Sequence, residues 1–273
     1  MERCTLRLQQ ASFSYLRGGH GPRTLICLHG YGESAESFAF LEPLLGQRYT
    51  LYALDLPWHG QTRWERGLTF PVGGLADLLR QLVPGFDTGR HTLLAYSMGG
   101  RVALSLLERL PHRFEQTVLL APDGLRVNPW YWLATQTQPG NRLFRFTMRH
   151  PQWFRGLVDK AGRRGWVNPG VRKFAHRYID DPQVREDLYR IWTTHRKFRP
   201  RMERISELVP AHRIRIDLVF GRYDRIIHTR NAHRLLSRLP PGQPWVQVHE
   251  LEAGHHLLQP KHAARWVSLL LQE

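Results

Sequence analysis

The sequence predicts an α/β fold with a mainly parallel, doubly wound sheet and an all-helical insertion. Three observations lead to this prediction. Short apolar runs bounded by turn residues alternate with segments whose apolar residues recur at helical spacing. The alternation stops after Leu120, and no clear strand pattern returns until Ile214. The residues between them show helical patterning and hold five of the nine tryptophans.

Six apolar runs predict the strands of the sheet, at 24–28, 49–54, 92–95, 117–120, 214–220 and 245–251. Five segments predict helices, at 34–45, 74–83, 98–110, 230–239 and 260–271. Because strand–helix–strand connections are right-handed crossovers, this alternation favours parallel pairing. The segments 5–10 and 12–17 predict an antiparallel hairpin at one edge. The expected core is therefore 1–125 with 205–273, and the expected insertion is a helical cap at 126–204.

The composition predicts a soluble, globular protein. A chain of 273 residues with 42% hydrophobic content can bury one large core and a modest insertion. No uncharged apolar stretch approaches the roughly 20 residues that cross a bilayer, and the first residues lack an apolar leader. We therefore expect a cytoplasmic protein. Only two cysteines occur, with Cys27 inside a predicted strand, so no disulfide framework or metal site is expected.

The net charge of +16 is uneven along the chain. Residues 126–204 hold 18 Lys and Arg against 6 Asp and Glu, and the remainder holds 21 against 17. Such a basic block attracts anionic small molecules or anionic membrane surfaces by its long-range field. An arginine-rich surface that is only solvated is the alternative. Nucleic acid is not an expected partner, and the oligomeric state is not predicted.

A nucleophile elbow is predicted at residues 95–100, which read Ala-Tyr-Ser-Met-Gly-Gly. A strand pattern precedes Ser97 and a helix pattern follows it, which is the context in which a sharp turn exposes a serine hydroxyl. Small residues two before and two after Ser97 allow the turn to close. The N-terminal amides of the following helix point at the site, so the Met98 N–H can stabilise developing negative charge.

Four further motifs accompany the elbow. They are Leu-His-Gly-Tyr-Gly at 28–32, Asp-Leu-Pro-Trp-His-Gly-Gln-Thr at 55–62, Gly-Arg-Tyr-Asp at 221–224 and Ala-Gly-His at 253–255. With the elbow, these motifs span nearly the whole chain, and together they resemble the α/β-hydrolase superfamily in its serine-nucleophile branch. The resemblance implies the α/β-hydrolase fold and the chain order Ser97, Asp224, His255 for a catalytic triad.

The roles follow from the chemistry of these groups. Serine needs an imidazole to take its proton during attack, and a carboxylate to orient that imidazole. Ser97 is the expected nucleophile, His255 the general base and Asp224 the orienting acid. The resemblance adds the backbone N–H of Tyr31 as second oxyanion donor beside Met98. His256 as base and Asp123 as acid remain open alternatives.

A dinucleotide fingerprint is formally present at 30–35, with Asp55 ending the next strand. It gives no reason for His29, Ser97 and His255 to appear in hydrolase order. No cofactor and no bound metal are therefore expected.

The expected activity is cleavage of a carboxylic ester or thioester through an acyl-serine intermediate. The expected ligand is a small molecule, anionic if arginines face the pocket. Candidate substrate-binding residues are Tyr96, Arg101, Trp130 and Trp132. Two roles are expected for Arg101: it binds a carboxylate of the substrate, or it makes a structural ion pair within the protein.

Two other functions remain open. Residues 96–101 and 55–57 resemble the menaquinone-pathway synthase that eliminates pyruvate to form succinyl-hydroxycyclohexadiene-carboxylate, a lyase that uses the same triad as a base. In that family the arginine after Gly-Gly holds substrate carboxylates, which implies this role for Arg101. The other alternative is a catalytically silent protein of this fold that binds a ligand.

Overall fold

The computed structural model describes residues 1–8, 10–165 and 178–272. They form two compact units. Unit 1 comprises Met1–Arg66, Phe70–Arg126 and Lys197–Glu273, and unit 2 comprises Gly67–Thr69 and Val127–Arg196. Residues 197–204, which the sequence analysis assigns to the insertion, thus belong to unit 1.

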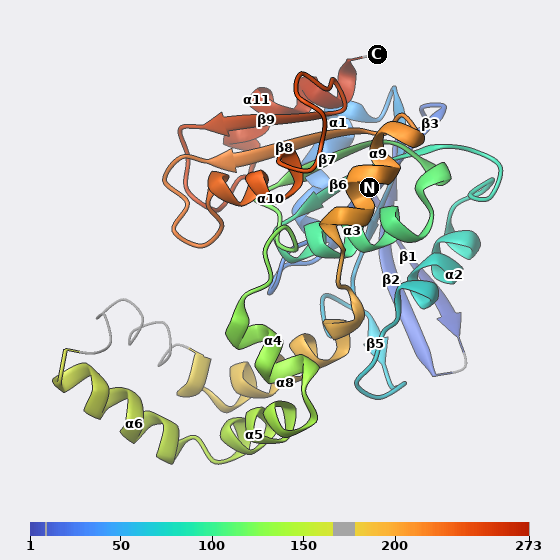
Figure 1. Cartoon of the computed structure of the whole chain (residues 1–273). Coiled ribbons are helices and arrows are strands. Elements are labelled where there is room, and N and C mark those ends of the chain that lie inside the picture. The colour runs from blue at the N-terminus through green and yellow to red at the C-terminus, as the bar shows by residue number, and fades with distance from the viewer. Residues whose placement is uncertain (9, 166–177, 273) are drawn as a thin grey trace. The chain divides into compact units, whose positions relative to one another are not determined.

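Unit 1 is built on one sheet (Figure 1). The described residues form the strands β1 (Glu2–Leu8), β2 (Ala11–Gly18), β3 (Arg23–Leu28), β4 (Tyr49–Leu54), β5 (Arg63–Trp64), β6 (His91–Tyr96), β7 (Phe114–Leu120), β8 (Arg215–Gly221) and β9 (Val246–Leu251). Their order is β1-β2-β4-β3-β6-β7-β8-β9, with β5 beside β2. The six strands from β4 to β9 in this path pair in parallel, while β1 and β2 form an antiparallel hairpin at one edge. The predicted fold class is confirmed.

The burial of each strand follows its place in the sheet. All six residues of β6, at the centre, are buried, and β7 and β8 each have one residue that is not. Central parallel strands are covered by helices on both faces, so they read as continuous apolar runs. The edge strand β1 alternates between exposed and half-buried residues instead. The continuous apolar runs in the sequence therefore result from the burial of these strands by helices on both faces of the sheet.

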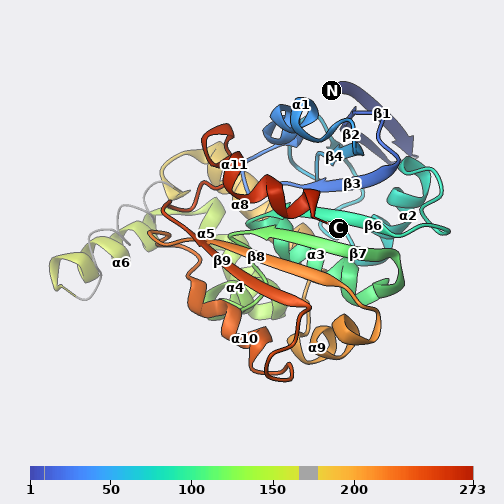
Figure 2. The same cartoon turned by 90° about the horizontal axis from the view of Figure 1, so that it is seen from above.

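Helices cover both faces of the sheet. Figure 2 shows α1 and α11 on one side and α3 and α9 on the other. The helices of unit 1 are η1 (Ala35–Leu41), α1 (Glu42–Leu45), α2 (Val72–Leu82), α3 (Met98–Arg109), η2 (Pro111–Arg113), α9 (Met202–Ala211), η4 (Thr229–Ala232), α10 (His233–Leu236) and α11 (Pro260–Leu271), and η3 (His195–Lys197) begins in unit 2. Within the described ranges, no helix has both the length and the apolar composition of a bilayer span.

One predicted helix differs from the structure. The segment 34–45 forms a 3-10 helix followed by a single α-turn, in place of one α-helix. Pro43 has no N–H to donate to a carbonyl four residues earlier, and its ring disfavours a helical residue before it. A carboxylate oxygen of Asp55 also accepts the Ala35 N–H at 2.7 Å and so caps the start of this segment.

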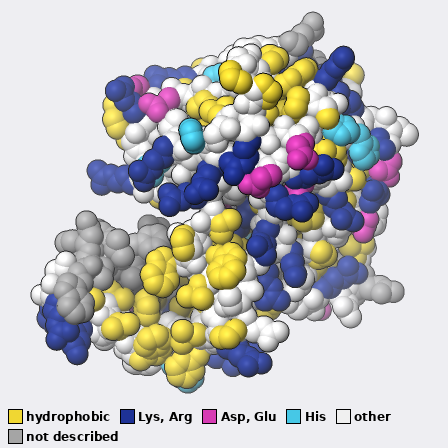
Figure 3. Space-filling model, viewed as in Figure 1, with side chains coloured by type: hydrophobic (Ala, Val, Ile, Leu, Met, Phe, Trp, Pro, Cys, Tyr) yellow, Lys and Arg dark blue, Asp and Glu magenta, His cyan; other side chains and the backbone are white. Residues whose placement is uncertain are grey.

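The regular secondary structure in the described residues of unit 2 is all helical. It contains α4 (Pro129–Gln136), α5 (Gln138–Arg149), α6 (Gln152–Arg163) and α8 (Pro182–Thr194). Side chains of Asn128, Thr137 and Asp181 accept backbone N–H groups at the starts of α4, α5 and α8. A small aromatic core joins Tyr131 and Trp192, whose ring centroids are 5.1 Å apart. Trp166 lies outside the described residues. Figure 3 shows many hydrophobic side chains on the face of unit 2 in view.

Candidate active site

Ser97 occupies a strained turn between β6 and α3. Its φ of 50° and ψ of −116° lie outside the regions that non-glycine residues ordinarily adopt. The turn is held by β7 and the loop after it: the Ser97 N–H donates to the Leu120 carbonyl at 2.9 Å, and the Asp123 N–H donates to the Ser97 carbonyl at 2.9 Å. Strain that persists because surrounding bonds determine it is typical of a functional residue.

Two glycines let α3 approach the sheet closely. A Cβ on Gly99 would lie 2.1 Å from the Leu28 carbonyl oxygen, and one on Gly100 would lie 2.6 Å from the Pro122 Cβ. No side chain fits at either position without moving backbone. The glycines therefore place the N-terminus of α3 directly beside the end of β3.

Three side chains from separate loops form one hydrogen-bonded line. Ser97 Oγ lies 3.0 Å from His255 Nε2, and His255 Nδ1 lies 2.7 Å from Asp224 Oδ2. Ser97 follows β6, Asp224 follows β8 and His255 follows β9. Since these strands are parallel, the loops after their carboxyl ends meet at one edge of the sheet.

The Asp224 carboxylate is buried and fully bonded. Its Oδ1 accepts the N–H groups of Ile226 at 2.7 Å and Ile227 at 3.0 Å, and its Oδ2 faces His255. Burial raises the pKa of this carboxyl, but the hydrogen bonds from His255, Ile227 and Ile226 lower it further, so its pKa lies below the ordinary value. The two backbone donors are contacts that the sequence analysis missed. An Asp at the start of a turn would have indicated these contacts, because an Asp side chain commonly accepts a hydrogen bond from the backbone N–H two residues later.

The two open alternatives make other contacts. His256 is exposed, and its Nδ1 lies 3.4 Å from the Tyr96 hydroxyl. Asp123 Oδ2 lies 3.5 Å from Arg101 Nε, and Asp123 Oδ1 accepts the Gly124 N–H at 2.7 Å. The structure thus brings Ser97, His255 and Asp224 together and places neither alternative in that line.

The turn that carries Tyr31 lies against the elbow. A Cβ on Gly30 would lie 3.2 Å from the Ser97 Cβ and 3.0 Å from a Tyr96 ring carbon. The Tyr31 backbone therefore follows a residue in near contact with Ser97. On the other side Met98 is the first residue of α3, where backbone N–H groups have no partner within the helix. Tyr31 thus follows a residue close to Ser97, and Met98 follows Ser97 itself.

Buried polar residues support this turn. His29 Nδ1–H donates to the Gly30 carbonyl at 2.8 Å, and His29 Nε2 accepts the Leu56 N–H at 3.0 Å. Complete burial lowers the pKa of His29, which keeps the ring neutral in this role. Asp55 likewise accepts the N–H groups of Ala35 and Gln61. Both residues therefore stabilise the loops that approach Ser97.

The predicted substrate-binding residues have different surroundings. Tyr96 is buried beside the triad, with its ring centroid 5.4 Å from that of His255, and burial raises the pKa of its hydroxyl. Arg101 is buried and faces Asp123. Trp130 and Trp132 lie on α4 in unit 2 with exposed side chains, 77% and 43% respectively.

Comparison with known proteins identifies the family and the fold. The sequence model described as the alpha/beta hydrolase family matches residues 25–269. The chain is 27% identical over 223 residues to the uncharacterized hydrolase YugF of Bacillus subtilis, covering 81% of this chain and 80% of that one. It is 32% identical over 116 residues to a pimeloyl-[acyl-carrier protein] methyl ester esterase of Nitrosomonas europaea, covering 42% and 43%. A solved serine hydrolase from Cycloclasticus zankles shares the fold at a TM-score of 0.65 and 19% identity, covering 99% and 97%.

Proposed function

Because the chain belongs to the alpha/beta hydrolase family, we propose that it is a serine hydrolase that cleaves a carboxylic ester or thioester through an acyl-serine intermediate. One observation carries the proposal. The hydrogen-bonded line from Ser97 Oγ through His255 to Asp224 has the order and distances that nucleophile, base and orienting acid require. The esterase among its relatives supports the choice of an ester substrate.

In the proposed reaction, Ser97 Oγ attacks the substrate carbonyl carbon while its proton passes to His255 Nε2. The carbonyl oxygen becomes an oxyanion that accepts hydrogen bonds from the N–H groups of Tyr31 and Met98. As the tetrahedral intermediate collapses, His255 returns the proton to the leaving alcohol or thiol. Water then attacks the acyl-serine with the same base, and the carboxylic acid leaves.

Asp224 acts through the imidazole. Its carboxylate accepts the Nδ1–H, which leaves Nε2 free to accept the serine proton, and its charge stabilises the imidazolium that forms. A serine at the elbow also argues against epoxide hydrolase and haloalkane dehalogenase chemistry, which need a carboxylate nucleophile. Tyr96, Trp130 and Trp132 remain the proposed contacts for an apolar part of the substrate.

The test is fluorophosphonate labelling of the full chain, combined with p-nitrophenyl esters of increasing acyl length. We expect labelling at Ser97 and turnover of at least one ester. A parallel reaction with the menaquinone-pathway intermediate provides the competing outcome. Pyruvate release without ester turnover would contradict the proposal and support the lyase.

Arg101 gives a separate prediction. Arg101→Met is expected to lower the free energy of unfolding by about 1 kcal/mol, because the ion pair between the buried Arg101 guanidinium and the partly exposed Asp123 carboxylate is lost. The ratio of kcat/KM for neutral and carboxylate-bearing esters is expected to stay unchanged. Urea unfolding and kinetics on both ester types check this. Selective loss of the carboxylate-bearing ester with unaltered stability would restore Arg101 as a substrate-binding residue.

A further inference from the structure

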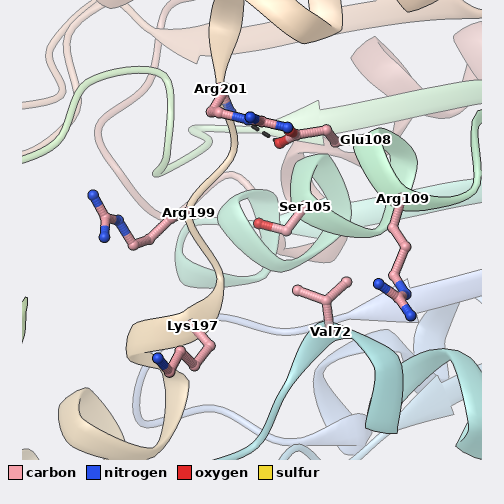
Figure 4. Close-up of a pocket in the computed structure, with 7 residues that line it drawn as sticks. All are labelled: Val72, Ser105, Glu108, Arg109, Lys197, Arg199 and Arg201. Carbon is pink, nitrogen blue, oxygen red and sulfur yellow. Dashed lines mark hydrogen bonds and ion pairs between the residues drawn. The ribbon is translucent and has the colours of Figure 1, made fainter.

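A pocket rich in basic side chains lies in unit 1, and no residue of the triad lines it (Figure 4). Its volume is about 350 Å³, within the range of small-molecule sites. We call it the basic pocket and define it by the charged residues that line it: Glu108, Arg109, Lys197, Arg199 and Arg201. None of these residues takes part in the proposed hydrolysis.

The sequence itself builds one wall of the basic pocket. From Lys197 to Arg201 basic residues alternate with Phe198 and Pro200, and the basic ones are exposed while the other two are buried. Phe198 is completely buried, with its ring centroid 5.7 Å from that of Phe70. Lys197 ends η3, and residues 198–201 connect it to α9. Because Phe198 and Pro200 are the buried residues of this connection, the three basic side chains are left exposed.

The second wall is the last turn of α3. Glu108 Oε1 accepts Arg201 Nε–H at 2.6 Å, and Glu108 Oε2 accepts the Arg201 N–H at 3.0 Å. Both oxygens of the Glu108 carboxylate therefore accept hydrogen bonds from Arg201. With the residues that the structure describes, neither Arg109 nor Lys197 makes an ion pair. Four cationic side chains and one carboxylate line the basic pocket, and that carboxylate pairs with Arg201.

The start of α2 adds to this field. Val72, the first residue of α2, also lines the pocket, and no side chain caps this helix and no acidic residue lies in its first turn. The Arg109 guanidinium lies beside it, since a Cβ on Gly73 would be 3.4 Å from Arg109 Nη2. A helix N-terminus carries a partial positive charge, so its usual neighbour is an anion. Here its neighbour is another cation.

We propose that the basic pocket binds a small molecule that carries a phosphate group. A phosphate carries up to two charges and three acceptor oxygens, which suit guanidinium groups that donate in pairs and a lysine that supplies a point charge. Bound there, it would supply the anionic partner that Arg109 and Lys197 lack among the described residues. The site is distinct from the triad: its lining residues on α3 lie between Ser105 and Arg109, which is about 12 to 18 Å along the helix from Ser97.

The test is isothermal titration calorimetry of the full chain with inorganic pyrophosphate at constant ionic strength. We expect saturable binding with one site per chain. The double variant Arg109→Gln/Arg199→Gln should weaken it by about tenfold or more, since it removes two charge-assisted contacts. The matched control Arg7→Gln/Arg66→Gln removes the same charge from exposed residues outside the pocket and should bind as the wild type does.

A third variant makes the opposite prediction. Glu108→Gln removes the one carboxylate of the pocket while an amide oxygen remains to accept from Arg201, so it should bind pyrophosphate several-fold more tightly. Inorganic phosphate and adenosine monophosphate, titrated separately, distinguish a free from an organic phosphate. Absence of saturable binding, equal loss in the control, or equally tight binding of citrate would each overturn the proposal. Fluorophosphonate labelling of Ser97 should be the same in all variants.

Discussion

Ser97→Ala is expected to lower kcat for ester hydrolysis by about a million-fold, the size of effect that loss of a nucleophilic serine has in a triad. The alanine cannot form the acyl intermediate, whereas the oxyanion donors and the binding residues remain. His255→Ala should be nearly as damaging. Because the two residues act as a unit, the double variant should be no worse than either single variant. Steady-state kinetics on the best p-nitrophenyl ester measures all three.

The fold of Ser97→Ala provides the control. Alanine keeps the Cβ and therefore the strained backbone at φ 50°, so we expect the stability to change by only about 1 kcal/mol, the value of the lost hydrogen bond to His255. Urea unfolding checks this. Losses that add in the double variant would show that Ser97 and His255 do not act on the same step.

Asp224→Asn is expected to lower kcat by about ten-thousand-fold, while Asp123→Asn should have little effect. An asparagine amide can donate to His255 Nδ1 and so favour the tautomer that has no free acceptor at Nε2. Asp123 carries the same functional group but faces Arg101, which makes it a matched control. Kinetics of the two variants on one ester decides between them. The reverse pattern would move the orienting role to Asp123.

The lowered pKa of Asp224 adds a pH dependence to this comparison. A carboxyl whose folded-state pKa is depressed contributes stability above its unfolded value of about 3.9, and this contribution is lost as the pH falls through the folded value. Acid unfolding curves should therefore be shallower in Asp224→Asn than in the wild type. Above about pH 5 the carboxylate stays ionised, so the kinetic defect should not depend on pH through this group.

The order of strands and helices was readable from local pattern because each central strand is covered on both faces. The apolar runs at 24–28, 49–54 and 92–95 all became parallel strands. The elbow was equally readable, since a strand, a sharp turn with small residues and a helix are consecutive in the chain. These features depend on neighbours within a few residues, which is the range over which periodicity and turn chemistry act. The family followed from the order of such local motifs.

The choices between similar residues needed the tertiary structure. Two histidines are adjacent at 255 and 256, and two aspartates follow strands at 123 and 224. Only the packing of loops after β8 and β9 shows which pair meets Ser97. The ion pair of Arg101 with Asp123 was likewise one of two expectations until the loop after β7 was placed. Contacts between residues far apart in sequence carry no local signal.

The boundary of the insertion and the basic pocket likewise could be determined only from the tertiary structure. The composition of 197–204 resembles that of the insertion, yet these residues belong to unit 1. Phe198 and Pro200 are buried, and the Phe198 ring packs against Phe70 of the same unit. The number of basic residues could be counted from the sequence. That Lys197, Arg199 and Arg201 line one pocket with Glu108 and Arg109 of α3 is seen only in the structure. The sequence alone therefore determined the fold class and the chemical groups available. The tertiary structure decided which groups meet, because only chain folding brings distant residues within hydrogen-bonding distance.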